Sequence, residues 1–133
     1  CDANKVCGVS CEEIDIMEAN QFAWHSTLHS AHDNNGKGSG YGGGSNFDGP
    51  RDFTSAQYSP GGSCVDTNQP FEVAASFHMD QTGGLAAMEV TLSQAGKSCP
   101  LTARVAGYAG NPQLAAALSK GMTPVFSYWS SDD

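Results

Sequence analysis

The feature that most constrains the fold is an alternation of apolar and polar residues with a period of two. In the segment 70–77 the apolar residues of one parity are Phe71, Val73, Ala75 and Phe77. The segment 85–93 repeats the alternation after the turn-forming pair Gly83-Gly84. Such runs are typical of half-buried β-strands, and two of them joined by a short glycine-containing turn predict a β-hairpin.

The rest of the chain favours short strands over a helix bundle. It holds 16 glycines and 6 prolines among 133 residues and few long apolar runs, a pattern that favours strands joined by turns. One short helix is predicted around Leu114–Leu118. Asn111 serves as its cap, Pro112 suits its first position and Gly121 ends it. Strand-type residues resume at Met122–Trp129, so we expect one all-β domain with a single short helix.

A strand, an exposed connection and a long loop are predicted in turn between residues 11 and 50. A strand is expected between Cys11 and Ala23, and Trp24–His32, with its histidine and hydroxyl side chains, is expected to continue as an exposed connection in which Trp24 packs. Asn34–Pro50 is rich in glycine, asparagine and serine, and this composition buries too little apolar surface to order itself easily. We expect a long loop there.

Charge and hydropathy argue against two classes of partner. Six Lys+Arg against fourteen Asp+Glu give a formal net charge of -8, which would repel a phosphate backbone. Nucleic acid is therefore not an expected partner. No apolar stretch approaches the roughly 20 residues that span a bilayer, so no membrane span is predicted.

The cysteines indicate an oxidising compartment or secretion. The five of them are Cys1, Cys7, Cys11, Cys64 and Cys99. A C-x3-C pair without a second pair, and an H-x3-H-x2-H run (residues 25–32) without a fixed acid nearby, are weak metal patterns. Disulfides are expected instead, with no metal and no cofactor. Because five is odd, at least one thiol is free or pairs outside this sequence, and a chain that starts at Cys without a signal peptide indicates a processed or truncated N-terminus.

Three acids fall within residues 13–18, Glu-Ile-Asp-Ile-Met-Glu. On a strand, Glu13 and Asp15 point to one face and the two isoleucines to the other, where a sheet would bury them. Glu18 has the opposite parity and would enter the core, an expensive place for an unpaired charge. A β-bulge near Met17 would return Glu18 to the acidic face.

With that bulge, the acids form a row suited to retaining glycoside hydrolysis, which needs two carboxyls about 5 to 5.5 Å apart. Glu13 is then the nucleophile, Glu18 the general acid and later base, and Asp15 tunes Glu13 by hydrogen bonding. The spacing alone leaves another interpretation open, that of a solvated acidic edge strand.

Residues 2–4 (Asp-Ala-Asn) and 11–20 (Cys-Glu-Glu-Ile-Asp-Ile-Met-Glu-Ala-Asn) resemble the catalytic segment of glycoside hydrolase family 7, the cellobiohydrolases and endoglucanases that cut cellulose. Thr27-Leu28-His29 resembles the family's segment with an active-site histidine, which implies that His29 neighbours the acid/base. Phe47–Arg51 resembles a loop whose arginine, here Arg51, binds substrate.

The resemblance continues in order towards the C-terminus. Tyr58–Gly61, Val65–Thr67 and Pro70-Phe71 match the family's sequence of segments, which implies that Asp66 is a groove residue. Gly121–Trp129 looks like the strand whose tryptophan, here Trp129, stacks on a sugar ring. Two positions depart from the family: Ser10 and Ala31 stand where it has cysteines, so its disulfide pairing cannot be transferred.

The fold implied by this resemblance is a concanavalin-like β-sandwich (jelly roll) with long loops and a substrate groove. The family's domain is much longer than this chain, so residues 1–133 correspond to the central portion of a single catalytic domain, and the sandwich is partial. Met17 and the run Gln21–His25 suggest a divergent protist-type member. The remaining part of the same domain, or a partner protein, is expected to cover the open sandwich.

The function expected from the acids and the resemblance together is retaining hydrolysis of β-1,4-glucosidic bonds in cellulose or a related β-glucan, the polysaccharide partner. Because much of the groove is absent, we do not expect activity from these 133 residues alone. The alternative is a non-catalytic fragment or recruited subunit, derived from such a domain, that binds a glycan or a protein.

Overall fold

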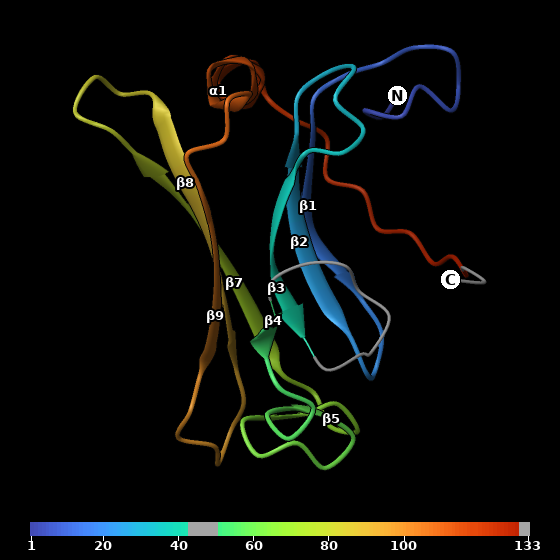
Figure 1. Ribbon diagram of the computed structural model, residues 1–133, viewed down its shortest axis with the longest axis vertical. Coiled ribbons are helices and arrows are strands. Elements are labelled where there is room, and N and C mark those ends of the chain that lie inside the picture. Colours follow the sequence, from blue (N-terminus) through green and yellow to red (C-terminus); the bar gives the residue numbers. More distant parts are fainter. Residues whose placement is uncertain (43–50, 131–133) are drawn as a thin grey trace.

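The computed structural model describes residues 1–42 and 51–130, whose strands form three sheets (Figure 1). The first sheet contains, in order, β1 (Glu13–Ala19), β2 (Trp24–His29), β3 (Lys37–Gly42) and β4 (Arg51–Phe53). The second contains β7 (Glu72–Met79), β8 (Leu85–Ser93) and β9 (Leu101–Ala106). A small third sheet pairs β5 (Tyr58–Ser59) with β6 (Val65–Asp66), and the helix α1 spans Asn111–Lys120. The chain is β-rich with one short helix among these residues, as its sequence predicts.

The predicted hairpin is confirmed by the antiparallel pairing of β7 with β8. Val73 lies opposite Leu92, and Phe77 lies opposite Met88. The Asp80 carboxylate closes the turn, because its Oδ1 accepts the backbone N–H of Thr82 at 2.8 Å and that of Gly84 at 2.9 Å. This fixed turn sets the register of the two strands.

The hydrophobic core lies between the two larger sheets, with α1 at one end and β5 at the other (Figure 1). Its fully buried apolar side chains include Trp24, Leu28, Tyr58, Val65, Met88, Val90, Leu92 and Leu114. The Trp24 indole meets the rings of Tyr58 and Phe71 edge to face, at centroid separations of 6.1 and 6.3 Å. Aromatic quadrupoles favour this arrangement, and the predicted packing role of Trp24 is confirmed.

Strand β2 replaces the exposed connection predicted for Trp24–His32. Its hydroxyl side chains at Ser26 and Thr27 are buried. The Ser26 hydroxyl donates to the Ile16 carbonyl at 2.9 Å and accepts the Trp24 indole N–H at 3.0 Å. A buried hydroxyl with hydrogen-bond partners costs little, so the prediction was wrong in equating polar side chains with exposure.

Strand β3 lies within Asn34–Pro50, the stretch predicted to be one long loop. It pairs antiparallel with β2, with Lys37 opposite Leu28 and Ser39 opposite Ser26. Backbone hydrogen bonds hold such a pair and need no side chain, so a glycine-rich segment can form a strand where a neighbour offers a free edge. Residues 43–50 lie outside the described residues.

Helix α1 confirms the predicted helix and corrects its capping. Gly110, not Asn111, is the residue at the cap, and no side chain caps the first turn. The Asn111 amide instead donates to the Ala86 carbonyl at 3.2 Å, which ties the helix to β8. No helix within residues 1–42 and 51–130 is long and apolar enough to cross a membrane.

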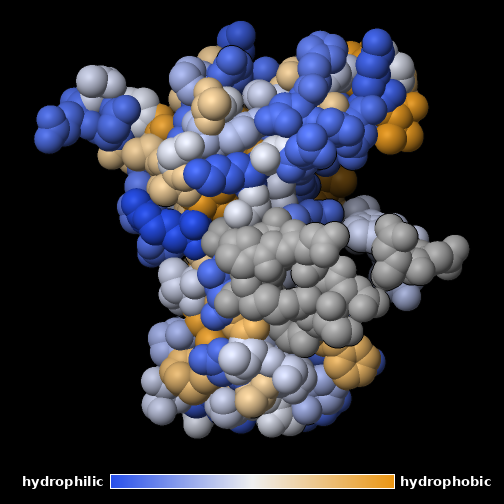
Figure 2. Space-filling view, viewed as in Figure 1, coloured by the Kyte–Doolittle hydropathy of each residue, from blue (hydrophilic) through white to orange (hydrophobic). Residues whose placement is uncertain are grey.

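The segment Met122–Trp129, predicted to be a strand, forms none in the structure. Strand-type residues form a strand only where a backbone edge pairs with them, and this segment has no strand partner among the residues described. Val125, Phe126 and Tyr128 are exposed in consequence. On the face of the molecule that Figure 2 shows, hydrophobic residues appear at several separate places.

Two disulfides confirm the predicted use of the cysteines. Cys1 pairs with Cys11, and Cys64 pairs with Cys99. Cys7 keeps an exposed free thiol, in agreement with the odd number of cysteines. The two bonds are compatible with an oxidising environment.

The position of α1 generates a stability prediction. Leu114→Ala removes a fully buried side chain and should lower the free energy of unfolding by about 2–5 kcal/mol. The matched control is Leu118→Ala on the same helix, where the side chain is only partly buried and the expected loss is smaller. Urea unfolding followed by circular dichroism measures both, and equal losses would contradict the burial of Leu114 in the core.

Candidate active site

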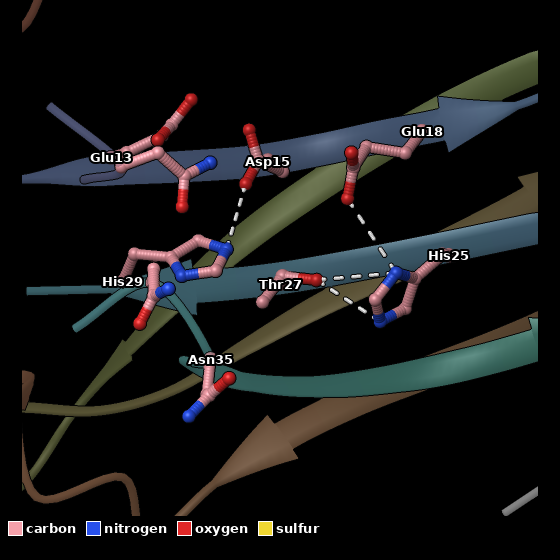
Figure 3. Close-up of a pocket in the computed structure, with 9 residues that line it drawn as sticks. Glu13, Asp15, Glu18, His25, Thr27, His29 and Asn35 are labelled. Atoms are coloured by element: carbon pink, nitrogen blue, oxygen red, sulfur yellow. Dashed lines mark hydrogen bonds and ion pairs between the residues drawn. The ribbon is translucent and has the colours of Figure 1, made fainter. Parts of the chain in front are cut away.

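A bulge in strand β1 gathers the three acids on one face. Asp15 pairs with Thr27 and Glu18 pairs with His25, so the step of 18 − 15 = 3 residues on β1 faces a step of 27 − 25 = 2 on β2. The extra residue on β1 reverses the faces to which the side chains after it point. The bulge predicted near Met17 is therefore confirmed, and Glu18 points to the same side as Asp15 (Figure 3).

The bulge also changes how deeply the two isoleucines are buried. Ile14 is half-buried and packs against the core. Ile16 is 37% exposed, so the expectation that both would be buried was wrong for Ile16. Its carbonyl oxygen nevertheless holds β1 to β2 by accepting the Ser26 hydroxyl. The bulge thus moves one apolar side chain outward while it keeps Glu18 out of the core.

The acids line an open depression of about 250 Å³. Strand β1 contributes Glu13, Asp15 and Glu18, and β2 contributes every second side chain (Figure 3). The loops that border the depression contribute asparagine side chains. The lining residues outside β1 are Asn4, His25, Thr27, His29, Asn34 and Asn35. All nine are polar, which suits a ligand rich in hydroxyl groups.

Glu13 is held by the N-terminal loop. Its Oε2 accepts the backbone N–H of Ala3 at 2.9 Å. The loop is closed by the disulfide from Cys1 to Cys11 and by the Ser10 hydroxyl, which donates to the Ala3 carbonyl at 3.2 Å. A charge-assisted hydrogen bond to one carboxylate oxygen orients the other, and Oε1 of Glu13 has no hydrogen-bond partner among the described residues.

Asp15 and His29 form the closest charged pair of the site. His29 Nε2 lies 3.2 Å from Asp15 Oδ2, and His29 Nδ1 lies 2.9 Å from the Asp33 carbonyl oxygen. A carbonyl oxygen can only accept, so Nδ1 carries a proton. The hydrogen bond to Asp15 raises the pKa of His29, with the Asp33 carbonyl and the charges of Asp15 and Glu13 adding to the rise against burial. These contacts therefore stabilise the protonated form of His29 more than water would.

This pairing changes the role that the sequence suggests for Asp15. A hydrogen bond from Asp15 to Glu13 was expected, but none joins these two side chains in the part of the chain that the structure describes. Asp15 contacts His29 instead. His29 was expected beside Glu18, the acid/base, but it pairs with Asp15 instead.

His25 occupies the place next to Glu18. Its Nδ1 lies 3.5 Å from Glu18 Oε2, and its Nε2 lies 3.0 Å from the Thr27 hydroxyl. No catalytic or binding role was expected for His25, because Trp24–His32 was expected to be an exposed connection. A strand interpretation would have found it, since His25, Thr27 and His29 alternate and must share one face.

Asp66, another predicted binding residue, does not line this depression. Asp66 lies in a separate one of about 390 Å³ beside Gln94 and Lys97. Its Oδ1 accepts the backbone N–H of Gly61 and of Asn68 at 2.7 and 3.0 Å, contacts that lower the pKa of Asp66 and give it a structural role in the turn.

Trp129 is likewise not among the described residues that line the depression. Trp129 lies in the C-terminal segment and is 60% exposed. Arg51 begins β4 opposite Tyr41, but its side chain, like residues 47–50 of its motif, lies outside the described residues. Among the residues that are described, no group of His, Cys, Asp or Glu is arranged to hold a metal ion.

The arrangement gives the two outer acids different surroundings. Glu13 is fixed by a backbone amide, whereas Glu18 stands at the bulge with 35% of its side chain exposed. Asp15 between them is paired with a cation-forming histidine. Carboxyls in unlike environments can take unlike roles, one as nucleophile and one as proton donor.

Comparison with known proteins adds no relative. No protein-family model, curated protein or solved structure matches the chain. The resemblance to glycoside hydrolase family 7 therefore rests on the sequence motifs alone.

The His29 contacts predict a pH dependence of stability. Because the folded pKa of His29 is raised, its stabilisation is complete below the unfolded value of about 6.5 and is lost as the pH rises through the folded value. His29→Gln should therefore cost about 1.5–3 kcal/mol of unfolding free energy near pH 5.5 and less near pH 8.5. Urea unfolding at both pH values measures the difference.

The control for this prediction is His78→Gln, which alters a largely exposed histidine 3.9 Å from Glu89. This variant should keep the wild-type pH dependence. A His29→Gln variant whose stability deficit is the same at both pH values would contradict the assignment.

Proposed function

We propose that the chain is part of a retaining glycoside hydrolase of the family 7 type, which cleaves β-1,4-glucosidic bonds in cellulose or a related β-glucan. The observation that carries the proposal is the bulge between Asp15 and Glu18, which brings three acids to one face of a polar depression. In a solvated edge strand the bulge would serve only to keep the Glu18 charge out of the core. Double displacement requires, in addition, two carboxyls about 5 to 5.5 Å apart that flank the anomeric carbon, one on each side of it.

In the first step the Glu13 carboxylate attacks the anomeric carbon while the bond from this carbon to the glycosidic oxygen breaks. Glu18 gives its proton to the departing oxygen, and a glycosyl ester of Glu13 remains. In the second step Glu18 takes a proton from water, the water oxygen attacks the anomeric carbon, and the ester bond breaks. Both displacements invert the centre, so the β configuration is retained.

The contacts of each acid support these roles. The Ala3 amide on Oε2 leaves the other oxygen of Glu13 available for attack. The exposed position of Glu18 gives water access for the second step. The contact of Asp15 with His29, whose pKa is raised, lowers the electrostatic cost of placing Asp15 between the other two acids.

We also propose that the two facing sheets belong to a concanavalin-like jelly roll of which residues 1–133 are the central portion. Val73 and Phe77 point to the core side of β7 yet are 37% and 38% exposed. Further strands, from the same domain or from a partner protein, would cover these side chains and complete the groove. Action on an extracellular polysaccharide fits a secreted, disulfide-containing protein.

A second candidate function is non-catalytic binding of a glycan or a protein. The observation that favours it is the exposure of Phe126, Tyr128 and Trp129 in one extended segment. Exposed aromatic rings are common contacts for sugars and proteins. Binding of cellulose that survives in a Glu13→Gln variant, without turnover by the wild type, would support this candidate over the first.

The acid roles predict the effect of neutral isosteres. Glu13→Gln and Glu18→Gln should each lower the rate of β-glucan hydrolysis by about a thousandfold or more, because each removes a group that bonds to, or exchanges a proton with, the reacting atoms. Release of reducing ends measures this in the longest polypeptide that contains the chain. The matched control is Glu12→Gln, which changes an adjacent acid that does not line the depression and should stay close to the wild-type rate.

Chemical trapping assigns the nucleophile independently. A 2-deoxy-2-fluoro-β-cellobioside with a good leaving group should add one glycosyl unit to the peptide that contains Glu13, because the fluorine slows breakdown of the ester. Glu13→Gln should not be labelled. Wild-type turnover in the Glu13→Gln variant would refute the assignment.

A further inference from the structure

Tyr108, in the connection between β9 and α1, reaches across the molecule to the loop that follows β2. Its hydroxyl lies 2.6 Å from Asp33 Oδ2 and accepts the backbone N–H of Ser30 at 2.8 Å. The tyrosine is buried. A phenol that donates to a carboxylate and accepts from an amide has both of its strong bonding positions used, so it fixes the loop in one place.

Asp33 holds the loop together from inside. Its Oδ1 accepts the backbone N–H of Gly36 at 3.1 Å, and its own N–H donates to the Ser30 carbonyl at 3.0 Å. Its carbonyl oxygen is the acceptor for His29 Nδ1. The Tyr108 hydrogen bond is the largest cause of the lowered pKa of Asp33, so this carboxylate stays ionised and bound to the phenol.

Two glycines allow this loop and this ring to approach so closely. A Cβ at Gly36, where φ is 56°, would lie 2.5 Å from His29 Nδ1. A Cβ at Gly110 would lie 2.4 Å from Tyr108 Cε1. Glycine at each of these positions therefore permits a close approach of backbone and ring that a side chain would block.

We propose that Tyr108 and Asp33 are positioning residues that hold the His29 imidazole with Nδ1 on the loop and its second N–H directed at Asp15. His29 then has an oxygen acceptor at each nitrogen, and a cation satisfies both. The charges that act on it are those of Asp15 and Glu13 from β1 and of Asp33 from the loop. The consequence for catalysis rests on the proposed function, but the positioning itself does not.

The test is an NMR titration of the His29 imidazole in the wild type and in Tyr108→Phe, which keeps the ring on Gly110 and removes only the hydroxyl. In the wild type, His29 should titrate above the ordinary histidine value of about 6.5, and its neutral form should keep the proton on Nδ1. In Tyr108→Phe, the proton affinity should fall by about threefold or more, and the tautomer with the proton on Nε2 should become populated.

The matched control is Tyr58→Phe, which removes another buried phenol, one that donates to the Asn20 carbonyl. Its His29 titration should equal that of the wild type. If Tyr108→Phe does not fold, Asp33→Asn, which removes the charge that receives the phenol, is titrated in its place with the same expected result. A folded variant with unchanged midpoint and tautomer would overturn the proposal, as would a wild-type His29 that titrates at or below the ordinary value.

These outcomes separate the positioning role from the proposed hydrolysis. The titration needs no glycan, so a shifted His29 in a protein that cleaves no β-glucan upholds the positioning and removes only its catalytic meaning. Where hydrolysis is measurable, Tyr108→Phe should lower kcat with little change in KM, because Tyr108 does not line the depression. Unchanged titration with intact hydrolysis would overturn the positioning and leave the proposed function standing.

Discussion

The arrangement of the site depends on one irregular pairing, the bulge between Asp15 and Glu18 in β1. Without it the strand would alternate regularly, and the Glu18 carboxylate would face the core, where an unpaired charge is expensive. With it, three carboxylates share one side and face His25 and His29 of the neighbouring strand. A single extra residue thus converts an amphipathic strand into an acidic surface, while the buried hydroxyl of Ser26 keeps the two strands joined at that point.

The acidic surface is stabilised from outside its own strand. The N-terminal loop supplies an amide to Glu13, and the loop after β2 supplies a carbonyl to the His29 imidazole. That loop is anchored by Tyr108, which belongs to the connection between the second sheet and α1. The positions of the acids therefore depend on the packing of both sheets. A change at the β9–α1 connection can alter the site through these hydrogen bonds.

Sequence patterns predicted the elements that can be recognised from the order of their side chains. The β7–β8 hairpin and α1 followed from alternation, turn residues and a proline-initiated helix, and the bulge followed from the conflict between parity and the charge of Glu18. Strand β9 shows the same alternation, with Leu101, Ala103 and Val105 buried, and was overlooked.

Elements held by the backbone or by buried polar groups were not predictable in this way. The glycines of β3 pair through their peptide groups, and Ser26 of β2 is buried because partners from elsewhere in the chain satisfy it. At the site, the acids and His29 came from local motifs. His25 was missed because its strand was missed, and the Asp33–Tyr108 contact joins residues 75 positions apart, a separation at which no local pattern operates.

If the bulged acid row performs double displacement, the first product must keep the configuration of the bond that was cut. Proton NMR, recorded in the first minutes of β-glucan hydrolysis before mutarotation, distinguishes the two anomers of the new reducing end. The β anomer should appear first, because two inversions at the anomeric carbon restore its configuration. Initial release of the α anomer would mean a single displacement by water and would contradict the assignment of Glu13 as the nucleophile.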